Sequence, residues 1–263
     1  MTASEHEVFA LRAVSLRRDG RAILTDVTWT IRDGERRAVL GPNGAGKTTL
    51  VRILSTYLVA SSGVSSVLGR RLGRTDVREL RTQVGYLSPA LAREVPEELT
   101  PRQIVDAAQA GALFPWYVDP GRMNRGRTDA ALKQVGLSEA YDRPYATYSS
   151  GEQLRIQLAR ALVSEPKALL MDEPMASLDI GGREGLISTL SHLAAGTIDA
   201  IVLVLHRVED IPPGFTHALL MRDGRIMVAG TVADIITDEA LSACFGLPLR
   251  VGRRSGRLSA VAG

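Results

Sequence analysis

The chain has 263 residues, of which 45% are hydrophobic and 23% are charged, a balance typical of a folded globular protein. A net charge of only +3 gives no reason to expect nucleic acid as a partner, and it leaves contact with acidic lipids or another protein open. No apolar run approaches the roughly 18 residues that cross a bilayer and the start lacks a signal peptide, so we expect a cytoplasmic protein that reaches a membrane only through a partner.

The first elements predicted from the sequence are strands. Alternating apolar residues predict strands over 8–16 and 23–31, joined by a hairpin-type turn at Asp19-Gly20. A third strand, 36–40, leads into a glycine-rich stretch that is followed by a helix. Two antiparallel strands beside a parallel core would give an α/β fold whose mixed sheet includes an antiparallel β subdomain.

The glycine-rich stretch has the pattern of a phosphate-binding loop, G-x-x-x-x-G-K-[ST]. Glycines let backbone N–H groups approach phosphate oxygens, and the helix adds its positive dipole end. Lys47 would bring a charge to the β- and γ-phosphates, and the Thr48 hydroxyl could ligate Mg²⁺. The alternative, a structural turn, is disfavoured by the strand–loop–helix context. The nucleotide-binding residues predicted here are Gly41, Pro42, Asn43, Gly44, Ala45, Gly46, Lys47, Thr48 and Thr49.

The composition changes in the middle of the chain. Between about 89 and 163 helix formers replace β-branched residues, which predicts a helical subdomain inserted into the α/β fold. The main helices predicted there span 101–112, 128–135 and 152–163. We expect a nucleotide-binding domain over 1–240 and a partly disordered tail over 241–263, because the tail is rich in Arg, Gly and Ser.

An apolar strand that ends in carboxylates follows the insertion. Leu169-Leu170-Met171 leads directly to Asp172 and Glu173. In a parallel sheet this strand end lies beside the phosphate loop, where Asp172 could hold Mg²⁺. Glu173 projects differently and could polarise the attacking water. The alternative is an ordinary strand end with a solvated acidic pair, which the phosphate loop makes less favoured.

A second anion site is predicted at the start of the last inserted helix. Ser149 fits a helix N-cap, with Glu152 three residues later as in a capping box. The simpler interpretation is that cap alone. In the other, a hydroxyl, a glycine and the helix N-terminus address the γ-phosphate of a nucleotide held by another copy of the chain. The residues concerned are Ser149, Ser150, Gly151 and Glu152.

Together these stretches resemble the ATP-binding domain of ABC ATPases over nearly the whole chain, up to about residue 230. The glycine-rich loop matches the Walker A motif, and Leu169 to Glu173 matches Walker B with the catalytic glutamate. Tyr148 to Gln153 resembles the signature motif, usually L-S-G-G-Q. His206, which follows an apolar strand, resembles the switch histidine. The counterpart of the D-loop is Ser177, Leu178 and Asp179.

The resemblance implies a P-loop NTPase of the ABC type that hydrolyses ATP with Mg²⁺. It implies a head-to-tail homodimer, or a pair with another ABC ATPase, in which ATP lies between the Walker A loop of one copy and the signature of the other. Glu173 would orient the water and His206 would contact the γ-phosphate, although His206 could instead be an ordinary histidine at a strand end. A separate transmembrane permease would hold the chain at the inner face of the cell membrane.

Three departures from the family pattern matter. Arg18 stands about where an aromatic residue usually stacks on adenine, and a guanidinium can also stack on a base. Ser88 stands where a glutamine usually helps bind Mg²⁺ and couples the site to the membrane subunit. Glu152 replaces the signature glutamine, and Ser150 replaces a glycine. With the residues after His206, these departures resemble a subset of ABC ATPases associated with molybdate- or iron-type importers.

Two other functions are compatible with parts of the sequence. A soluble single-domain ABC ATPase of the iron–sulfur-assembly type would fit the length of the chain. A small-molecule kinase would also use a phosphate loop, but the signature-like stretch and the Asp172-Glu173 pair disfavour it. We therefore expect the ATP-hydrolysing subunit of an ABC transporter.

Overall fold

The structure is a computed structural model that describes residues 6–119, 121, 123–137 and 142–263, so the parts of the predicted domain and helical insertion at 1–5, 120, 122 and 138–141 lie outside the described residues. The strands are β1 Glu7–Arg18, β2 Arg21–Arg32, β3 Arg36–Leu40, β4 Ser62–Val67, β5 Arg70–Arg71, β6 Val84–Leu87, β7 Ala168–Asp172, β8 Ala200–Val204, β9 His217–Arg222, β10 Arg225–Thr231, β11 Leu249–Arg254 and β12 Arg257–Ala262. The helices are α1 Lys47–Leu54, α2 Val77–Gln83, α3 Pro89–Arg93, α4 Pro101–Gln109, α5 Arg125–Gln134, α6 Ser150–Leu162, α7 Ile180–Ala194, α8 Val232–Ile235 and α9 Asp238–Phe245, with short 3₁₀ helices η1 Pro115–Tyr117, η3 Tyr145–Thr147 and η4 Val208–Asp210.

A central six-stranded sheet in the order β10-β9-β3-β8-β7-β6 organises the molecule. Its strands run parallel except for β10, which pairs antiparallel with β9. Every residue of β3, β7 and β8 is buried, as expected for parallel strands covered on both faces. Ligands of such sheets bind beyond the carboxyl ends of the strands, and here the predicted phosphate loop and Asp172 lie at those ends.

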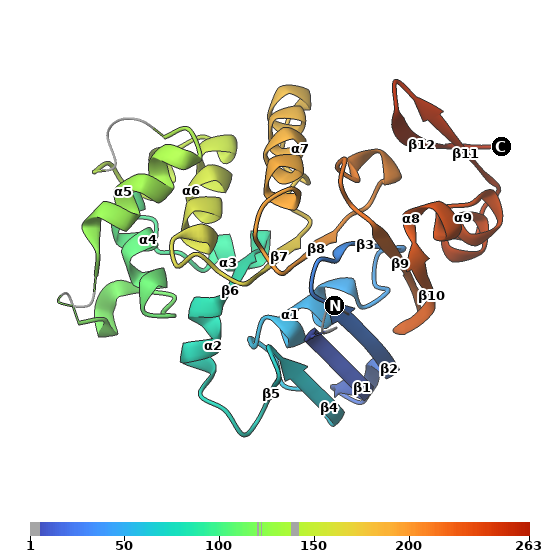
Figure 1. Ribbon diagram of the computed structural model, residues 1–263, viewed down its shortest axis with the longest axis horizontal. Coiled ribbons are helices and arrows are strands. Elements are labelled where there is room, and N and C mark those ends of the chain that lie inside the picture. Colours follow the sequence, from blue (N-terminus) through green and yellow to red (C-terminus); the bar gives the residue numbers. More distant parts are fainter. Residues whose placement is uncertain (1–5, 120, 122, 138–141) are drawn as a thin grey trace, which may run out of the picture.

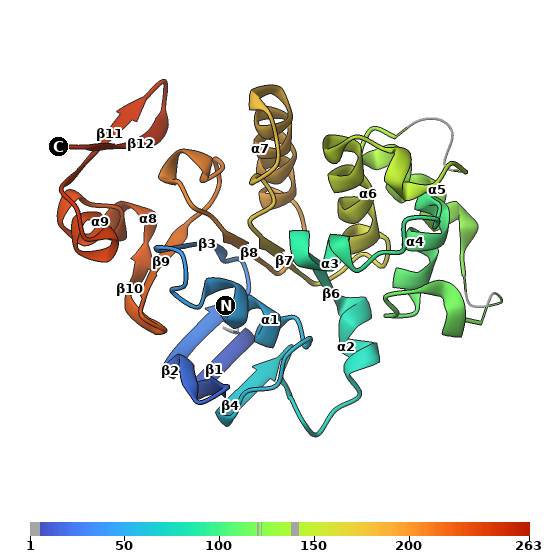
Figure 2. The same cartoon turned by 180° about the vertical axis from the view of Figure 1, so that it is seen from behind.

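Two apolar layers sandwich this sheet. Val39 and Leu170 belong to a core cluster that includes α1 and the strands β1 and β2. Their neighbours Ala38 and Leu169 belong to a second cluster built with the helices on the opposite face. This alternation follows the period-two geometry of strands, and it places α1, which follows the phosphate loop, between the two sheets (Figures 1 and 2).

The second sheet, in the order β2-β1-β4-β5, is the antiparallel β subdomain predicted from the first strands. The β1–β2 hairpin carries several register shifts, and Ala13 and Asp26 have positive φ angles of 51° and 52°. Such bulges increase strand twist, which lets the hairpin curve over α1. The predicted α/β fold with a mixed sheet and an antiparallel subdomain is therefore confirmed.

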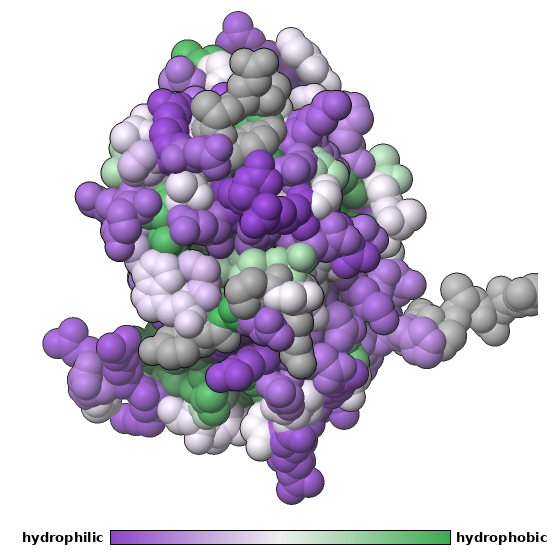
Figure 3. Space-filling view, turned by 90° about the vertical axis from the view of Figure 1, so that its left-hand side faces the viewer, coloured by the Kyte–Doolittle hydropathy of each residue, from purple (hydrophilic) through white to green (hydrophobic). Residues whose placement is uncertain are grey.

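The helices α3 to α6 form a separate group on one side of the sheet (Figures 1 and 2). Buried polar contacts tie two of them together, since Thr128 of α5 bonds to Asp106 and receives a 2.9 Å hydrogen bond from Gln109, both on α4. The visible described surface of this side is mostly hydrophilic (Figure 3). The helices thus turn their apolar sides inward, as in an independent helical layer.

The C-terminal part differs from the predicted partly disordered tail. Helix α9 is capped by Gly246, and β11 and β12 form an antiparallel hairpin with a Ser255-Gly256 turn, both residues having positive φ. Such turns match the twist of hairpin strands. Leu249, Val251, Leu258 and Ala260 pack against the core. Their alternation with Arg, Gly and Ser gives this segment an apolar face that overall composition hides.

In the part of the chain that the structure describes, no helix combines the length and the apolar character needed to cross a bilayer.

Gly85 sets the distance between the sheet and the helical layer. A Cβ atom at this position would lie 2.4 Å from the carbonyl oxygen of Ala161 on α6, so Gly85→Ala must push α6 away from β6. We expect a loss of about 1–3 kcal/mol in free energy of unfolding, measured by urea denaturation.

The matched control is Gly185→Ala, on helix α7, where nothing lies within 4 Å of the added Cβ. This change should leave stability unchanged or raise it by up to about 1 kcal/mol, because alanine favours helices. Equal stability of the two variants would show that the close approach at Gly85 is not required.

Candidate functional site

The predicted phosphate loop runs from the end of β3 to the start of α1 and is held from both sides. A Cβ atom on Gly41 would lie 2.1 Å from the carbonyl oxygen of Met221, so this position must be glycine for β9 to pass close by. Gly46 has a φ of 95° and would place a Cβ 2.7 Å from the side chain of Leu24 on β2. Because α1 begins directly afterwards, the loop presents the N-terminus of a helix to any anion bound there.

Lys47 is buried, with only 4% of its surface exposed. Its Nζ donates hydrogen bonds to the carbonyl oxygens of Gly41 at 2.8 Å and Pro42 at 3.0 Å. Burial lowers the pKa of the ammonium, while the nearby carboxylates of Glu173 and Asp172 raise it. A phosphate oxygen would provide the strong acceptor that a buried ammonium favours.

Asp172, at the end of β7, faces the first turn of α1. The hydroxyl of Thr48 donates a hydrogen bond to Asp172 Oδ1 over 3.2 Å. The carboxylate is 3% exposed, and burial raises its pKa to about 6. Two oxygen ligands on neighbouring elements, one of them a buried carboxylate in need of positive charge, match the preference of Mg²⁺ for hard oxygen donors. The residues present therefore fit a magnesium ion.

Glu173 and His206 form the next part of the site. His206 Nε2 and Glu173 Oε2 are 2.7 Å apart, and both side chains remain partly exposed. Glu173 has a φ of 52°, which is unusual for a residue with a side chain, and its N–H donates to the carbonyl of Val204 at 3.1 Å. Unusual backbone angles of this kind cluster at functional sites. The pair offers a carboxylate and an imidazole that a water molecule or a phosphate can reach.

The segment after His206 is anchored to α7. Arg183 of α7 forms an ion pair with Asp210 of η4, which is 5% exposed. A pocket lined by Glu173, His206 and Arg183 lies along this contact. Sequence reasoning did not find Arg183 or Asp210, because an ion pair across 27 positions leaves no local signal.

The predicted second anion site is at the start of α6. Ser149 caps the helix, its backbone N–H donates to Glu152 Oε2 at 2.8 Å, and its hydroxyl lies 2.8 Å from the same oxygen. Arg143 also donates to Glu152, over 3.1 Å. The capping box is thus fully formed within the chain, and these bonds lower the pKa of Glu152.

This helix start is distant from the phosphate loop of the same chain. The two lie well apart in Figure 1, where α6 and α1 belong to different lobes. A Cβ atom on Gly151 would meet nothing within 4 Å, so the chain's own packing does not require glycine there. Ser150 is exposed beside it at the first position of the helix.

The predicted D-loop residues precede α7. Asp179 caps this helix by accepting a 2.7 Å hydrogen bond from the N–H of Gly182, and Leu178 packs partly against the core. Ser177 lines a pocket together with Ser88 and Ser150. This pocket brings the D-loop, the start of α3 and the signature-like helix together.

Two predicted residues stand outside the cluster around Lys47. Arg18, at the tip of the β1–β2 hairpin, is largely exposed and only 3.9 Å from its neighbour Asp19. Ser88 is buried and caps α3 by accepting a hydrogen bond from the N–H of Leu91 over 3.1 Å. The Ser88 hydroxyl therefore has a structural partner at α3.

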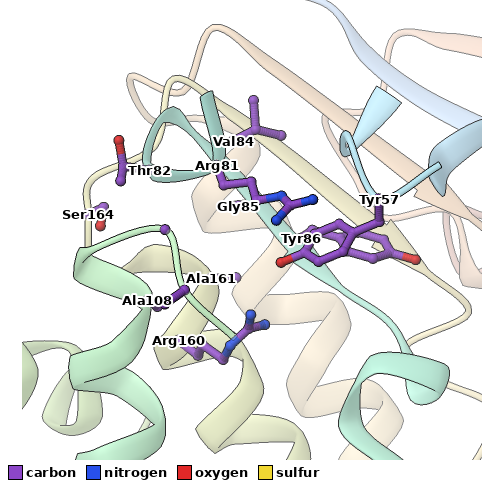
Figure 4. Close-up of a pocket in the computed structure, with 12 residues that line it drawn as sticks. Tyr57, Arg81, Thr82, Val84, Gly85, Tyr86, Ala108, Arg160, Ala161 and Ser164 are labelled. Atoms are coloured by element: carbon purple, nitrogen blue, oxygen red, sulfur yellow. The ribbon is translucent and has the colours of Figure 1, made fainter. Parts of the chain in front are cut away.

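A further pocket, not predicted from the sequence, lies where the helical layer meets the sheet (Figure 4). The side chains of Arg81, Tyr86 and Arg160 point toward a common space. Arg160 is 6% exposed, and its Nε has no hydrogen-bond partner among the described residues. A buried guanidinium donor without an acceptor is costly, so this pocket favours an incoming acceptor group.

Comparisons with known proteins agree with this geometry. A family model described as ABC transporter matches residues 24–176. The uncharacterized ABC transporter ATP-binding protein YlmA of Bacillus subtilis (strain 168) is 36% identical over 246 residues, 93% of this chain and 93% of that protein. The hemin import ATP-binding protein HmuV of Rhizobium johnstonii is 33% identical over 251 residues, 91% of each. The solved structure of cbiO1 from Clostridium perfringens, described as part of the transporter complex cbiONQ, has a TM-score of 0.73 at 25% identity and covers 91% of this chain and 94% of that one.

The buried charge of Asp172 should lower the stability of the fold, although we expect the same carboxylate to be needed for ATP hydrolysis. Because its pKa is about 6 in the folded chain and about 4 when unfolded, stability falls as pH rises between these values and stays lowered above them. Asn carries no charge, so Asp172→Asn should raise the free energy of unfolding at pH 8 by about 1–3 kcal/mol in EDTA, while ATP hydrolysis is lost.

Urea denaturation at pH 8 tests this, with Asp223→Asn, an exposed carboxylate, as the control that should not change stability. A variant at Asp172 that is no more stable than the wild type would show that the buried charge is compensated within the chain.

Proposed function

The chain belongs to the ABC transporter family, and we propose on this premise that it drives a separate membrane permease by ATP binding and hydrolysis. It is an ATP-binding subunit of an ABC transporter, and it hydrolyses ATP. The single observation that carries the detailed mechanism is the set of groups at the carboxyl edge of the central sheet, where Lys47, Asp172 and Glu173 converge. We assign this nucleotide-binding unit to residues 1–240.

In the proposed mechanism the phosphate loop binds the triphosphate of ATP. Backbone N–H groups between Gly41 and Thr49 surround the phosphates, and Lys47 exchanges its two carbonyl partners for phosphate oxygens. Thr48 and Asp172 would hold Mg²⁺, an ion that neutralises phosphate charge when bound. Arg18, exposed on the hairpin, is free to stack on adenine.

Glu173 orients the attacking water and accepts its proton as the water approaches the γ-phosphate. His206 holds the carboxylate in place through the 2.7 Å contact and contacts the γ-phosphate from the other side. Exposure of both side chains supports this proposal, because water must reach the pair. When the γ-phosphate leaves, His206 loses that contact.

A second copy completes the site in the proposed head-to-tail dimer. The N-terminus of α6, with Ser149, Ser150 and Gly151, would face the γ-phosphate bound by the other copy, and Ser177 to Asp179 would lie beside it. Free space around Gly151 supports this proposal, since close approach of another molecule explains a glycine that the chain itself does not need. The γ-phosphate then links two surfaces, and its loss separates them.

We propose that the permease is an importer for an iron-containing compound and that the chain is cytoplasmic, held at the inner face of the membrane. The name of HmuV, a hemin import protein, supports this cargo class. The relatives carry transporter names, and no observation favours the soluble assembly ATPase.

The permease would dock where the helical layer meets the sheet. The pocket of Figure 4 has no acidic residue among the 12 residues that line it, although it contains Arg81 and the buried Arg160. Strand β6 leads from this pocket directly to Ser88. An acidic side chain of the permease would supply the missing acceptor and connect the membrane subunit to the nucleotide site.

Glu173→Gln tests the mechanism and the dimer together. The amide cannot accept a proton from water, so ATP should bind while hydrolysis falls by at least about a hundredfold, and the chain should elute as a dimer with Mg-ATP on gel filtration. Adding Gly151→Val should restore the monomer without changing ATP affinity, because the added side chain has room within one chain but not at the interface. A Glu173→Gln protein that stays monomeric with ATP contradicts the proposed sandwich.

Thr82→Glu tests the docking pocket. Thr82 is one of the lining residues, so a carboxylate there adds negative charge that should repel an acidic side chain of the permease and reduce its co-purification from native membranes by about tenfold or more. Thr82→Gln is the matched neutral control, and both variants should keep the ATPase activity of the isolated chain. Equal recovery of the permease with both variants rules out an acidic contact at this site.

A further inference from the structure

The C-terminal hairpin reaches the segment that carries His206. Arg257, the first residue of β12, donates to the carbonyl oxygen of Glu209 at 2.6 Å. Its other terminal nitrogen donates to both carboxylate oxygens of Glu184 on α7, each at 2.7 Å. One guanidinium therefore bridges the helix after the D-loop and the turn that follows His206 by three residues.

A second hydrogen bond joins the hairpin to the same residue, Glu209, this time at its side chain. The backbone N–H of Ala260 on β12 donates to Glu209 Oε1 at 2.9 Å. Glu209 is thus held at its main chain by Arg257 and at its side chain by the hairpin backbone. Paired, charge-assisted hydrogen bonds of this kind fix both distance and orientation.

The hairpin itself is fixed to the body of the protein. Asp238, at the start of α9, accepts a 2.7 Å hydrogen bond from the N–H of Val251 and a 3.0 Å bond from Arg250. Leu249 and Leu258 pack against the core. A pocket between α9, the hairpin and the turn is lined by His206 itself, together with Glu209, Leu249 and Ala260.

The ion pair between Arg183 and Asp210 joins the turn after His206 directly to α7. Glu184 is the next residue on the same helix, and Arg257 connects it to the turn. The hairpin thus supplies a second anchor, at Glu209, the residue before Asp210. Two anchors restrict rotation of a short segment in a way that one cannot.

From these contacts we propose that Arg257 is a positioning residue for ATP hydrolysis, which holds His206 in register with Glu173 by clamping the turn at Glu209 against α7. The inference rests on the proposed role of His206. Arg257 touches neither nucleotide nor reacting atoms, so it acts on the rate of the chemical step and not on ATP binding. Through this one residue the C-terminal hairpin would influence the position of His206.

The test compares Arg257→Ala with the matched control Arg253→Ala. Arg253 lies on the same hairpin, is exposed, and donates a hydrogen bond to Gly256 of the hairpin turn. The Arg253→Ala change therefore removes the same charge without affecting the contacts of Glu209. In the full-length chain, Arg257→Ala should lower kcat for ATP about tenfold with KM unchanged, and Arg253→Ala should match the wild type. Arg257→Lys, which can reach only one partner well, should give an intermediate kcat.

A double-mutant cycle with His206→Ala separates positioning from a general structural effect. If Arg257 acts through His206, adding Arg257→Ala to His206→Ala should cause no further loss of kcat. Multiplying losses would overturn the inference, as would a wild-type kcat for Arg257→Ala. Should Arg257→Ala fail to fold, Glu184→Gln, which weakens the clamp from the other side, takes its place in the same cycle.

The single variants of this cycle also test the role of His206 separately from the role of Arg257. A His206→Ala chain with wild-type kcat would remove the role proposed for His206, and with it the premise of the inference. A slow His206→Ala chain beside a fast Arg257→Ala chain would leave the proposed function intact and reject only the clamp.

Discussion

Buried charge at the carboxyl edge of the central sheet is the constraint on which the rest of the structure depends. Lys47 and Asp172 are almost completely buried. Burial lowers the pKa of Lys47 and raises that of Asp172, so it favours the neutral form of each side chain. Loop carbonyls and the Thr48 hydroxyl compensate these charges only in part. Such an edge favours a ligand that brings negative charge to the ammonium and positive charge to the carboxylate, as a nucleoside triphosphate with its cation does. The apolar strands on both sides make the edge rigid enough to keep these groups in place.

Features set by short stretches of chain could be predicted from the sequence. The phosphate loop needs a strand, a few glycines and a helix start within about a dozen residues, and all of these are adjacent in the chain. The capping box of Ser149 and Glu152 is equally local, and so is the carboxylate at the end of an apolar strand. Parallel strands then bring their carboxyl ends to one edge, so the meeting of Thr48 with Asp172, 124 positions apart, follows from fold class alone.

Contacts between distant segments without a motif could not be predicted. Arg257 and Glu184 are 73 positions apart, and nothing near either residue signals the other. The same holds for Arg183 with Asp210 and for the pocket that contains Arg160. Composition was misleading for the C-terminal end, because arginines and glycines suggest disorder while Leu249, Val251 and Leu258 supply the apolar face of a hairpin. Whether such a face finds a surface to cover depends on the tertiary structure, which local pattern does not contain.

The unusual signature can be explained by the capping geometry. A carboxylate at Glu152 would repel a γ-phosphate. Here Arg143 and the backbone N–H of Ser149 both donate hydrogen bonds to this carboxylate, and these bonds partly compensate its negative charge. The Ser149 hydroxyl lies 2.8 Å from the same carboxylate, which cannot donate when ionised, so the hydroxyl must be the donor in that contact. To bind phosphate with its hydroxyl, Ser149 must therefore give up the bond to Glu152, whereas the backbone N–H groups at the start of α6 remain available. In the proposed dimer, Glu152 would thus shift anion binding from the serine hydroxyl to the helix N-terminus, where Ser150 and Gly151 leave room for close approach.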